Sequence, residues 1–299
     1  MRSGHDVEQR RTGAREDALK EVLAGAPVTE RRLQLAGIST PVLEGGHGRP
    51  LVLLHGPGEF AAGWVEVLPG LATTNRVVVP DLPGHGASEV ADGPLHAGRV
   101  IAWLSELIAA TCTEPPVLVG RVVGGAIAAR FAIEHGDQIA GLVLVDTFGL
   151  TPFEPAPEFG LALNNFLEGP SDGSYERLMQ VCSFDLNHLR DRLGERWARF
   201  AAYAVDRAST PEVMAAIGVL VGEFGMTAIP PEELATIAVP SSLIWGRHDL
   251  ATPLAVAETA SSRFGWPLHV IEDAADDPAL DQPEAFLRAL HVACEHVGA

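Results

Sequence analysis

The sequence is poor in cysteine, in positive charge and in long apolar runs, and each shortage excludes a class of protein. Three cysteines, Cys112, Cys182 and Cys294, are too few and too scattered for a disulfide framework or a thiolate metal site. We therefore expect buried thiols and a cytoplasmic location. The 299 residues hold 21 basic and 39 acidic side chains, a net charge of −18, which disfavours nucleic acid and anionic membranes as partners. No stretch approaches the roughly 20 apolar residues that span a bilayer.

The amino-terminal segment also lacks the features of a targeting signal. Residues 1–27 contain no uninterrupted apolar region and place five acidic side chains among their arginines, so we expect neither a signal peptide nor a transit peptide. We interpret residues 1–30 as a tail or a short surface helix. The rest of the chain, with 47% hydrophobic residues overall, can bury a full core.

Strand patterns alternate with helical patterns along most of the chain. Apolar runs at 51–54, 76–80, 116–120, 139–145, 242–246 and 268–271 read as buried strands. Such alternation specifies an α/β fold, with a mostly parallel sheet and helices on both faces. Between 151 and 231 only helical patterns occur, including single patterns over 187–205 and 211–224. They predict a helical cap inserted into a core formed by 31–150 and 232–299, over the strand ends where open sheets bind ligands.

One turn is the most specific motif. An apolar strand pattern enters it, an alanine-rich helical pattern leaves it, and Gly120, Gly124 and Gly125 surround its tip. Gly120 and Gly124 stand where a side chain would collide with neighbouring backbone, and Gly125 lets the helix start lie close to the sheet. This is the G-x-S-x-G pattern of a nucleophile elbow, with Val122 in place of the nucleophile. The chain here resembles the α/β-hydrolase superfamily, especially its capped esterases and carbon–carbon bond hydrolases.

The resemblance extends over residues 32–297 through two further segments, Pro80-Asp-Leu-Pro-Gly-His-Gly86 and Trp245-Gly-Arg-His-Asp249. It implies an α/β-hydrolase-like fold and a mechanism with a nucleophile, an acid and a histidine base. Asp249 holds the acid position, and alignment on the Gln-Pro-Glu start of the last helix puts Asp276 at the histidine position. Because the Val122 side chain cannot attack a carbonyl and no imidazole is in place, we expect no Ser-His-Asp hydrolysis.

The resemblance also locates a candidate ligand site. The family's oxyanion donors fall near Pro57, which has no amide hydrogen, so Gly58 and Val123 would have to supply the backbone donors. Arg121, next to Val122, either pairs with the acidic group or binds an anion; a surface or interdomain salt bridge is the alternative. The candidate ligand-binding residues are thus Pro57, Gly58, Arg121, Val122 and Val123. The motif histidines lack metal-site spacing, and we expect no metal and no cofactor.

Asp249 and Asp276 are the candidate catalytic residues. Two adjoining, partly buried carboxylates cannot both ionise freely, so one would keep its proton near neutral pH and the pair could act as general acid and base. In the alternative, Asp276 and Asp277 are solvated or cap a loop, while Asp249 is held by backbone donors or by Arg121.

A fold does not decide a function, and three hypotheses remain. The first is a protein without a conventional triad that binds a small apolar ligand under the cap, with lyase, isomerase or cyclase chemistry that needs no covalent intermediate. The second is a pseudoenzyme with a structural or interaction role. The third is a hydrolase of esters or carbon–carbon bonds that acts through unconventional residues. The sequence favours the first, and it indicates no oligomeric state.

Overall fold

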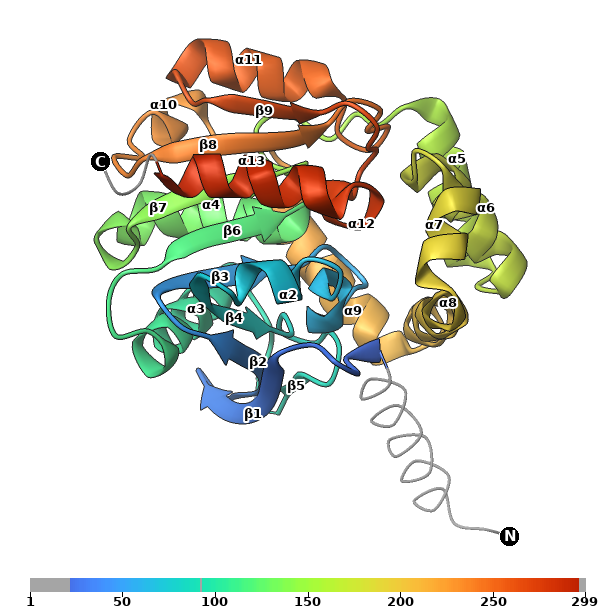
Figure 1. Cartoon of the computed structure of the whole chain (residues 1–299), viewed down its shortest axis with the longest axis horizontal. Helices are drawn as coiled ribbons and strands as arrows, with labels where there is room; N and C mark the ends of the chain where they lie inside the picture. Colours follow the sequence, from blue (N-terminus) through green and yellow to red (C-terminus); the bar gives the residue numbers. More distant parts are fainter. Residues whose placement is uncertain (1–21, 92, 296–299) are drawn as a thin grey trace, which may run out of the picture.

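The computed structural model describes residues 22–91 and 93–295, so most of the predicted tail lies outside the described residues. Figure 1 shows a central sheet with helices on both faces and a group of helices set to one side. The strands are β1 Val28–Leu35, β2 Ile38–Gly46, β3 Arg49–Leu54, β4 Asn75–Pro80, β5 Glu89–Val90, β6 Val117–Arg121, β7 Gly141–Val145, β8 Ser241–Gly246 and β9 Leu268–Ile271.

The sheet has the order β1-β2-β4-β3-β6-β7-β8-β9, with β5 paired to β2. The strands from β4 to β9 along this order are parallel, whereas β1 with β2 and β2 with β4 are antiparallel. Each parallel pair needs a crossover, and the chain supplies it with a helix. The predicted mostly parallel sheet with helices on both faces is confirmed.

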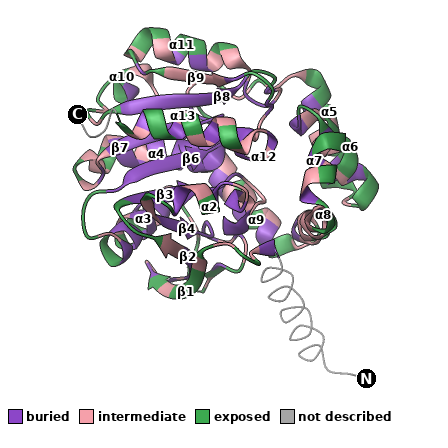
Figure 2. Ribbon diagram, in the orientation of Figure 1, coloured by how far each residue is buried: buried purple, intermediate pink, exposed green. Residues whose placement is uncertain are grey.

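The core helices form two layers. They are η1 Ala61–Trp64, α2 Leu68–Leu71, α3 Ala97–Thr111, α4 Val123–His135, η2 Gly136–Gln138, α11 Leu254–Phe264, α12 Pro278–Asp281 and α13 Pro283–Glu295. One hydrophobic cluster joins α3, α4 and α11 to one face of the sheet, and a second joins α2 and α13 to the other. Figure 2 shows the central strands coloured almost throughout as buried.

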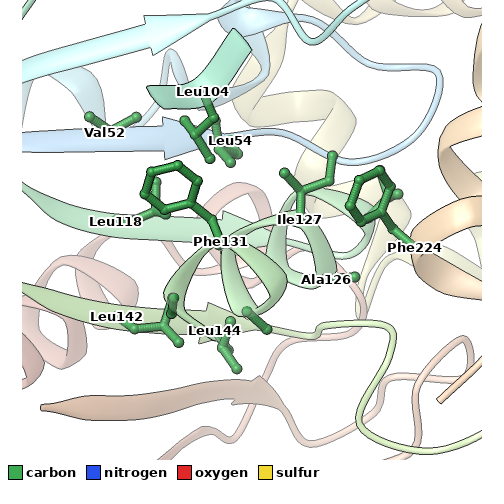
Figure 3. Close-up of a cluster of buried hydrophobic side chains, with 14 of the residues drawn as sticks. Val52, Leu54, Leu104, Leu118, Ala126, Ile127, Phe131, Leu142, Leu144 and Phe224 are labelled. Carbon is green, nitrogen blue, oxygen red and sulfur yellow. The ribbon is translucent and has the colours of Figure 1, made fainter. Parts of the chain in front are cut away.

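Helix α4 is the most enclosed of these helices. Figure 3 shows its side chains Ala126, Ile127 and Phe131 packed against Leu118 of β6 and Leu144 of β7. Burying a side chain of this size contributes roughly 1.5–3 kcal/mol. This packing fixes the amino-terminal end of α4, where the turn after β6 ends.

The segment between β7 and β8 is helical, as predicted. It contains α5 Pro157–Glu168, α6 Asp172–Cys182, α7 Leu186–Leu193, α8 Glu195–Ala208, α9 Pro211–Leu220, the π-helical η3 Val221–Gly225 and α10 Pro231–Leu234. In Figure 1, α5 to α8 stand beside the core as a cap and α9 leads back to it. The domain boundaries at 30/31, 150/151 and 231/232 stay predictions.

Two of the predicted cap helices are divided. The pattern over 187–205 forms α7 and α8, which meet at Gly194 with φ of 56°. A residue in that conformation ends a right-handed helix, and glycine adopts it without steric cost. The pattern over 211–224 changes from α9 to the π-helical turn η3.

Candidate functional site

The turn between β6 and α4 has the geometry of a nucleophile elbow although its tip is a valine. Val122 has φ of 51° and ψ of −113°, a conformation that costs a β-branched residue about 1–3 kcal/mol. The surrounding backbone holds it there: its N–H donates to Val145 O at 3.1 Å. Its carbonyl accepts from Phe148 N and from Thr147 Oγ1, both at 3.2 Å.

Glycine is required on both sides of this tip. A Cβ on Gly120 would lie 2.3 Å from Gly124 O, and one on Gly124 would lie 2.6 Å from His55 O. A Cβ on Gly125 would lie 2.2 Å from Thr147 Oγ1. The predicted reason for these glycines, close packing of helix start and strand, is therefore confirmed.

The first turn of α4 points its amides toward the tip. Val122 is the N-cap residue, and its hydrocarbon side chain has no acceptor with which to cap the orphan N–H groups of the helix. Amides at a helix start carry a partial positive charge and bind anions. The N–H of Val123 belongs to this turn, and Gly58, with φ of 74°, lies in the loop after β3. These are the predicted oxyanion donors, a role that stays a prediction.

Asp249, in the loop after β8, is held by three donors. Its Oδ1 accepts from Ala251 N at 2.7 Å and Thr252 N at 2.9 Å, and its Oδ2 accepts from Thr252 Oγ1 at 2.5 Å. Burial nevertheless raises the pKa of this carboxyl to about 6, although these hydrogen bonds lower it. Backbone donors thus hold Asp249, as the alternative prediction stated.

Asp276 follows β9 and is half-buried. Burial raises the pKa of its carboxyl well above the ordinary value, and the negative charge of Asp249 raises it further. The two predicted catalytic residues are therefore electrostatic neighbours. Both carboxyls therefore keep their protons to higher pH than an ordinary aspartate does.

A third carboxyl, Asp146, belongs to this group and was not predicted. It follows β7, is fully buried, and accepts from Gly246 N at 2.9 Å through Oδ1. Its carboxyl lies close enough to Asp249 for the two negative charges to repel, and its buried Oδ2 has no hydrogen-bond partner among the described residues. Burial and the charge of Asp249 raise the pKa of Asp146. The available signal was an aspartate at the end of a predicted buried strand. Because β7 and β8 are neighbours in the sheet, the residues that follow them lie close together.

Arg121 is buried and forms its ion pairs with Glu59 and Asp277, not with the carboxyls of the predicted pair Asp249 and Asp276. Its guanidinium forms an ion pair with Glu59, lies 3.3 Å from Asp277 Oδ2, and donates from Nη1 to Asp276 O at 3.2 Å. Asp277 also caps α12, because its Oδ1 accepts from Leu280 N at 3.0 Å. Of the alternative, a surface or interdomain salt bridge, the surface form does not hold, because the buried Arg121 side chain ties the loop after β3 to the loop after β9.

His55 fixes a loop. Its Nε2 accepts from Leu82 N at 2.9 Å and its Nδ1 donates to Gly56 O at 2.8 Å. Burial lowers the pKa of the ring to about 3, so the imidazole is neutral at working pH. Both ring nitrogens are occupied, and His55 cannot serve as the base.

A cavity of about 330 Å³ opens beside this group, between the loop after β7 and the start of α11. Its walls are mostly apolar and include Phe148, Phe153 and Val256, and Thr252 joins the cavity wall to Asp249. Within residues 22–91 and 93–295, no three histidine, cysteine or acidic side chains are grouped so as to hold a metal. In the same ranges no helix has the length and apolar character needed to cross a membrane.

Comparisons with known proteins place these features in a family. Residues 51–289 match the model of the alpha/beta hydrolase family. A pimeloyl-[acyl-carrier protein] methyl ester esterase of Aeromonas hydrophila is 28% identical over 85% of this chain and 98% of its own. A 2-hydroxymuconate semialdehyde hydrolase of Pseudomonas sp. is 30% identical over 78% of this chain and 82% of its own.

Solved structures agree on the fold. The 2-hydroxy-6-oxo-6-phenylhexa-2,4-dienoate hydrolase of Rhodococcus sp. strain RHA1 is 25% identical, with a TM-score of 0.76 over 91% of this chain and 99% of its own. A bacterial membrane phospholipase A is 22% identical, with a TM-score of 0.79 over 96% of this chain and 92% of its own, a likeness of fold alone.

These relatives contradict the favoured functional hypothesis. We expected a ligand-binding protein with non-hydrolytic chemistry or, as an alternative, a pseudoenzyme, because Val122 and Asp276 replace the nucleophile and the histidine. The relatives are named as an esterase and as hydrolases, and the match covers 82–99% of their own chains. The physical error was to equate loss of serine and imidazole with loss of hydrolysis, which needs only a base for water and donors for an oxyanion.

Proposed function

Because the chain belongs to the alpha/beta hydrolase family, we propose that it is a hydrolase that adds water to a carbonyl carbon and breaks an ester or an adjacent carbon–carbon bond. The methyl ester esterase among its relatives supports the ester bond, and the carbon–carbon bond follows from the resemblance of the sequence motifs to capped carbon–carbon bond hydrolases. The observation that carries the proposal is Asp276, a half-buried carboxyl of raised pKa at the family's base position, next to the Asp249 carboxyl.

Water takes the part of the absent nucleophile in this proposal. Asp276, once ionised, accepts a proton from a water molecule as the water oxygen bonds to the carbonyl carbon. The tetrahedral intermediate then collapses: the bond to the leaving oxygen or carbon breaks, and Asp276 returns the proton to that atom. The products are a carboxylic acid and an alcohol or a protonated carbon fragment, and no bond to the enzyme forms.

Asp249 acts on Asp276 rather than on water. Thr252 and Ala251 supply three hydrogen bonds to its carboxyl, so its oxygens are largely occupied. Its negative charge raises the pKa of Asp276, and a carboxylate of higher pKa is a stronger base. Asp249 thus has the role that the family's acid has toward histidine.

The start of α4 stabilises the oxyanion. The Val123 N–H and the positive end of the α4 dipole lie at the elbow tip, and Gly58 N–H is the candidate second donor, because Pro57 has no amide hydrogen. Each such donor contributes about 10²–10³-fold to the rate of acyl transfer.

The test is hydrolysis by the purified protein of p-nitrophenyl acetate and butyrate and of 2-hydroxy-6-oxo-6-phenylhexa-2,4-dienoate. We expect Asp276→Asn to lower kcat/KM by about 10²–10⁴-fold. Asp273→Asn is the matched control, an exposed aspartate in the same loop, and it should retain wild-type activity. Absence of turnover for every substrate would refute a hydrolase of these classes.

Intact-protein mass spectrometry during turnover tests the water route separately. Direct attack by water leaves the protein mass unchanged at every time point. An acyl adduct on the wild-type chain would show that a side chain is the nucleophile and would overturn the role assigned to Asp276.

A further inference from the structure

Asp281 joins the cap to the loop that carries Asp276. Its side chain is buried at the end of α12, and its Oδ2 accepts two backbone hydrogen bonds. One comes from Phe184 N of the cap at 3.0 Å, and the other from Ala275 N of the loop after β9 at 2.9 Å. A single oxygen thus fixes the distance between the α6–α7 junction and the residue before Asp276.

Arg192 strengthens this connection from α7. Its Nη1 donates to Asp281 O at 2.9 Å, and its Nη2 donates to Leu280 O. The Leu280 side chain packs against the apolar cluster that Leu186, Leu189 and Leu193 of α7 form. Helix α12 is therefore held to the cap by polar and apolar contacts together.

The same cap segment reaches the proposed base. Cys182, the last residue of α6, is buried and lies two positions before Phe184. Burial raises the pKa of its thiol, and the negative charge of the nearby Asp276 carboxyl raises it further. The end of α6 thus lies near the side chain of Asp276 as well as near its loop.

We propose that Asp281 is a positioning residue that fastens the α6–α7 junction of the cap to the Asp276 loop and so sets the place of the Asp276 carboxyl. Its effect on turnover rests on the proposed function, whereas the fastening itself does not. The carboxyl at 281 holds two chain segments nearly a hundred residues apart in the sequence, so its loss frees both at once.

The reactivity of Cys182 reports on this fastening without any substrate. The protein is treated with N-ethylmaleimide, and the peptide that contains Cys182 is quantified by mass spectrometry, which separates it from Cys112 and Cys294. Asp281→Ala removes two hydrogen bonds to a buried acceptor, so local opening should raise the labelling rate of Cys182 about tenfold or more. Asp281→Asn retains a carbonyl oxygen for both donors and should restore a rate within about threefold of wild type.

Ser171→Ala is the matched control in the cap. Ser171 is exposed and caps the start of α6 by accepting from Ser174 N at 3.2 Å, so its loss weakens α6 at the end opposite to Cys182 and α12. We expect unchanged labelling of Cys182 in this variant. Should Asp281→Ala fail to fold, Arg192→Gln removes the other polar link and is expected to raise the labelling rate in the same direction.

Activity measurements on the same variants separate the two proposals. With the fastening lost, kcat should fall in Asp281→Ala while Asp281→Asn restores it. If the labelling of Cys182 rises in Asp281→Ala while the wild-type protein hydrolyses none of the substrates, the proposed role of Asp281 stands and the proposed hydrolase is refuted. Labelling of Cys182 within twofold of wild type in folded Asp281→Ala, or an equal rise in Asp281→Asn, would overturn the role of Asp281.

Discussion

Replacing Asp249 by asparagine should stabilise the protein at alkaline pH while lowering its activity. Burial raises the pKa of this carboxyl from 3.8 to about 6. Protonated Asp249 therefore contributes its full share to the free energy of unfolding below pH 4, and this contribution is lost as the pH rises through 6. At pH 8 the ionised Asp249 destabilises the fold by about 3 kcal/mol relative to a neutral side chain.

Asparagine keeps the geometry without the charge. Its Oδ1 can accept from Ala251 N and Thr252 N, and its amide can donate to Thr252 Oγ1. We therefore expect Asp249→Asn to unfold at a melting temperature higher than wild type by on the order of 5 °C at pH 8. Roughly half of the free-energy difference should remain at pH 5.

The assay is thermal unfolding of wild type, Asp249→Asn and the exposed control Asp273→Asn at pH 5, 6.5 and 8. The control should track wild type at each pH. A variant less stable than wild type at pH 8 would show that the donors around Asp249 outweigh its desolvation. A stability difference independent of pH would show that its ionisation is not linked to folding.

The remaining predictions concern the elbow and the base. The kcat/KM of wild type should rise with pH as Asp276 ionises. Asp249→Asn should move this rise to lower pH, because removing a neighbouring negative charge lowers the pKa of Asp276. An unchanged pH profile would count against the coupling of the two carboxyls. The double variant Val122→Ser with Asp276→His should gain a covalent route, forming an acyl-enzyme with esters and becoming labelled by a fluorophosphonate, both seen by mass spectrometry. A variant without either adduct would mean that the elbow lacks hydrolase geometry. Gly124→Ala should lower the free energy of unfolding in urea by about 3 kcal/mol, because its Cβ would lie 2.6 Å from His55 O; a smaller loss would mean that the helix start shifts freely.

The sheet and the elbow could be predicted because their signals are local. Apolar runs of strand length and the steric demand for Gly120, Gly124 and Gly125 are both written in adjacent residues. The approach of Asp276 to Asp249 could be predicted only through the family resemblance, which supplies positions that no spacing in the chain provides. Helix boundaries in the cap were less predictable, since Gly194 interrupts a continuous apolar pattern.

The rest of the site depends on contacts between distant segments. Asp146 meets Asp249, and Asp281 meets Phe184, across about a hundred residues, and neither aspartate stands in a motif that marks it. The partners of Arg121 could not be predicted either, because the sequence does not tell whether a charged residue next to a turn is buried or exposed. The function predicted from the sequence was wrong for a chemical reason. A missing nucleophile excludes an acyl-enzyme intermediate, but hydrolysis by water that a carboxylate activates does not require that intermediate.

The backward-bent conformation of Val122 has an evolutionary consequence. Three glycines and the hydrogen bonds of the Val122 backbone impose that bend. None of these interactions involves the valine side chain. The identity of the tip residue is thereby uncoupled from the shape of the turn, so selection can exchange one reactive group for another, or for none, while the scaffold persists.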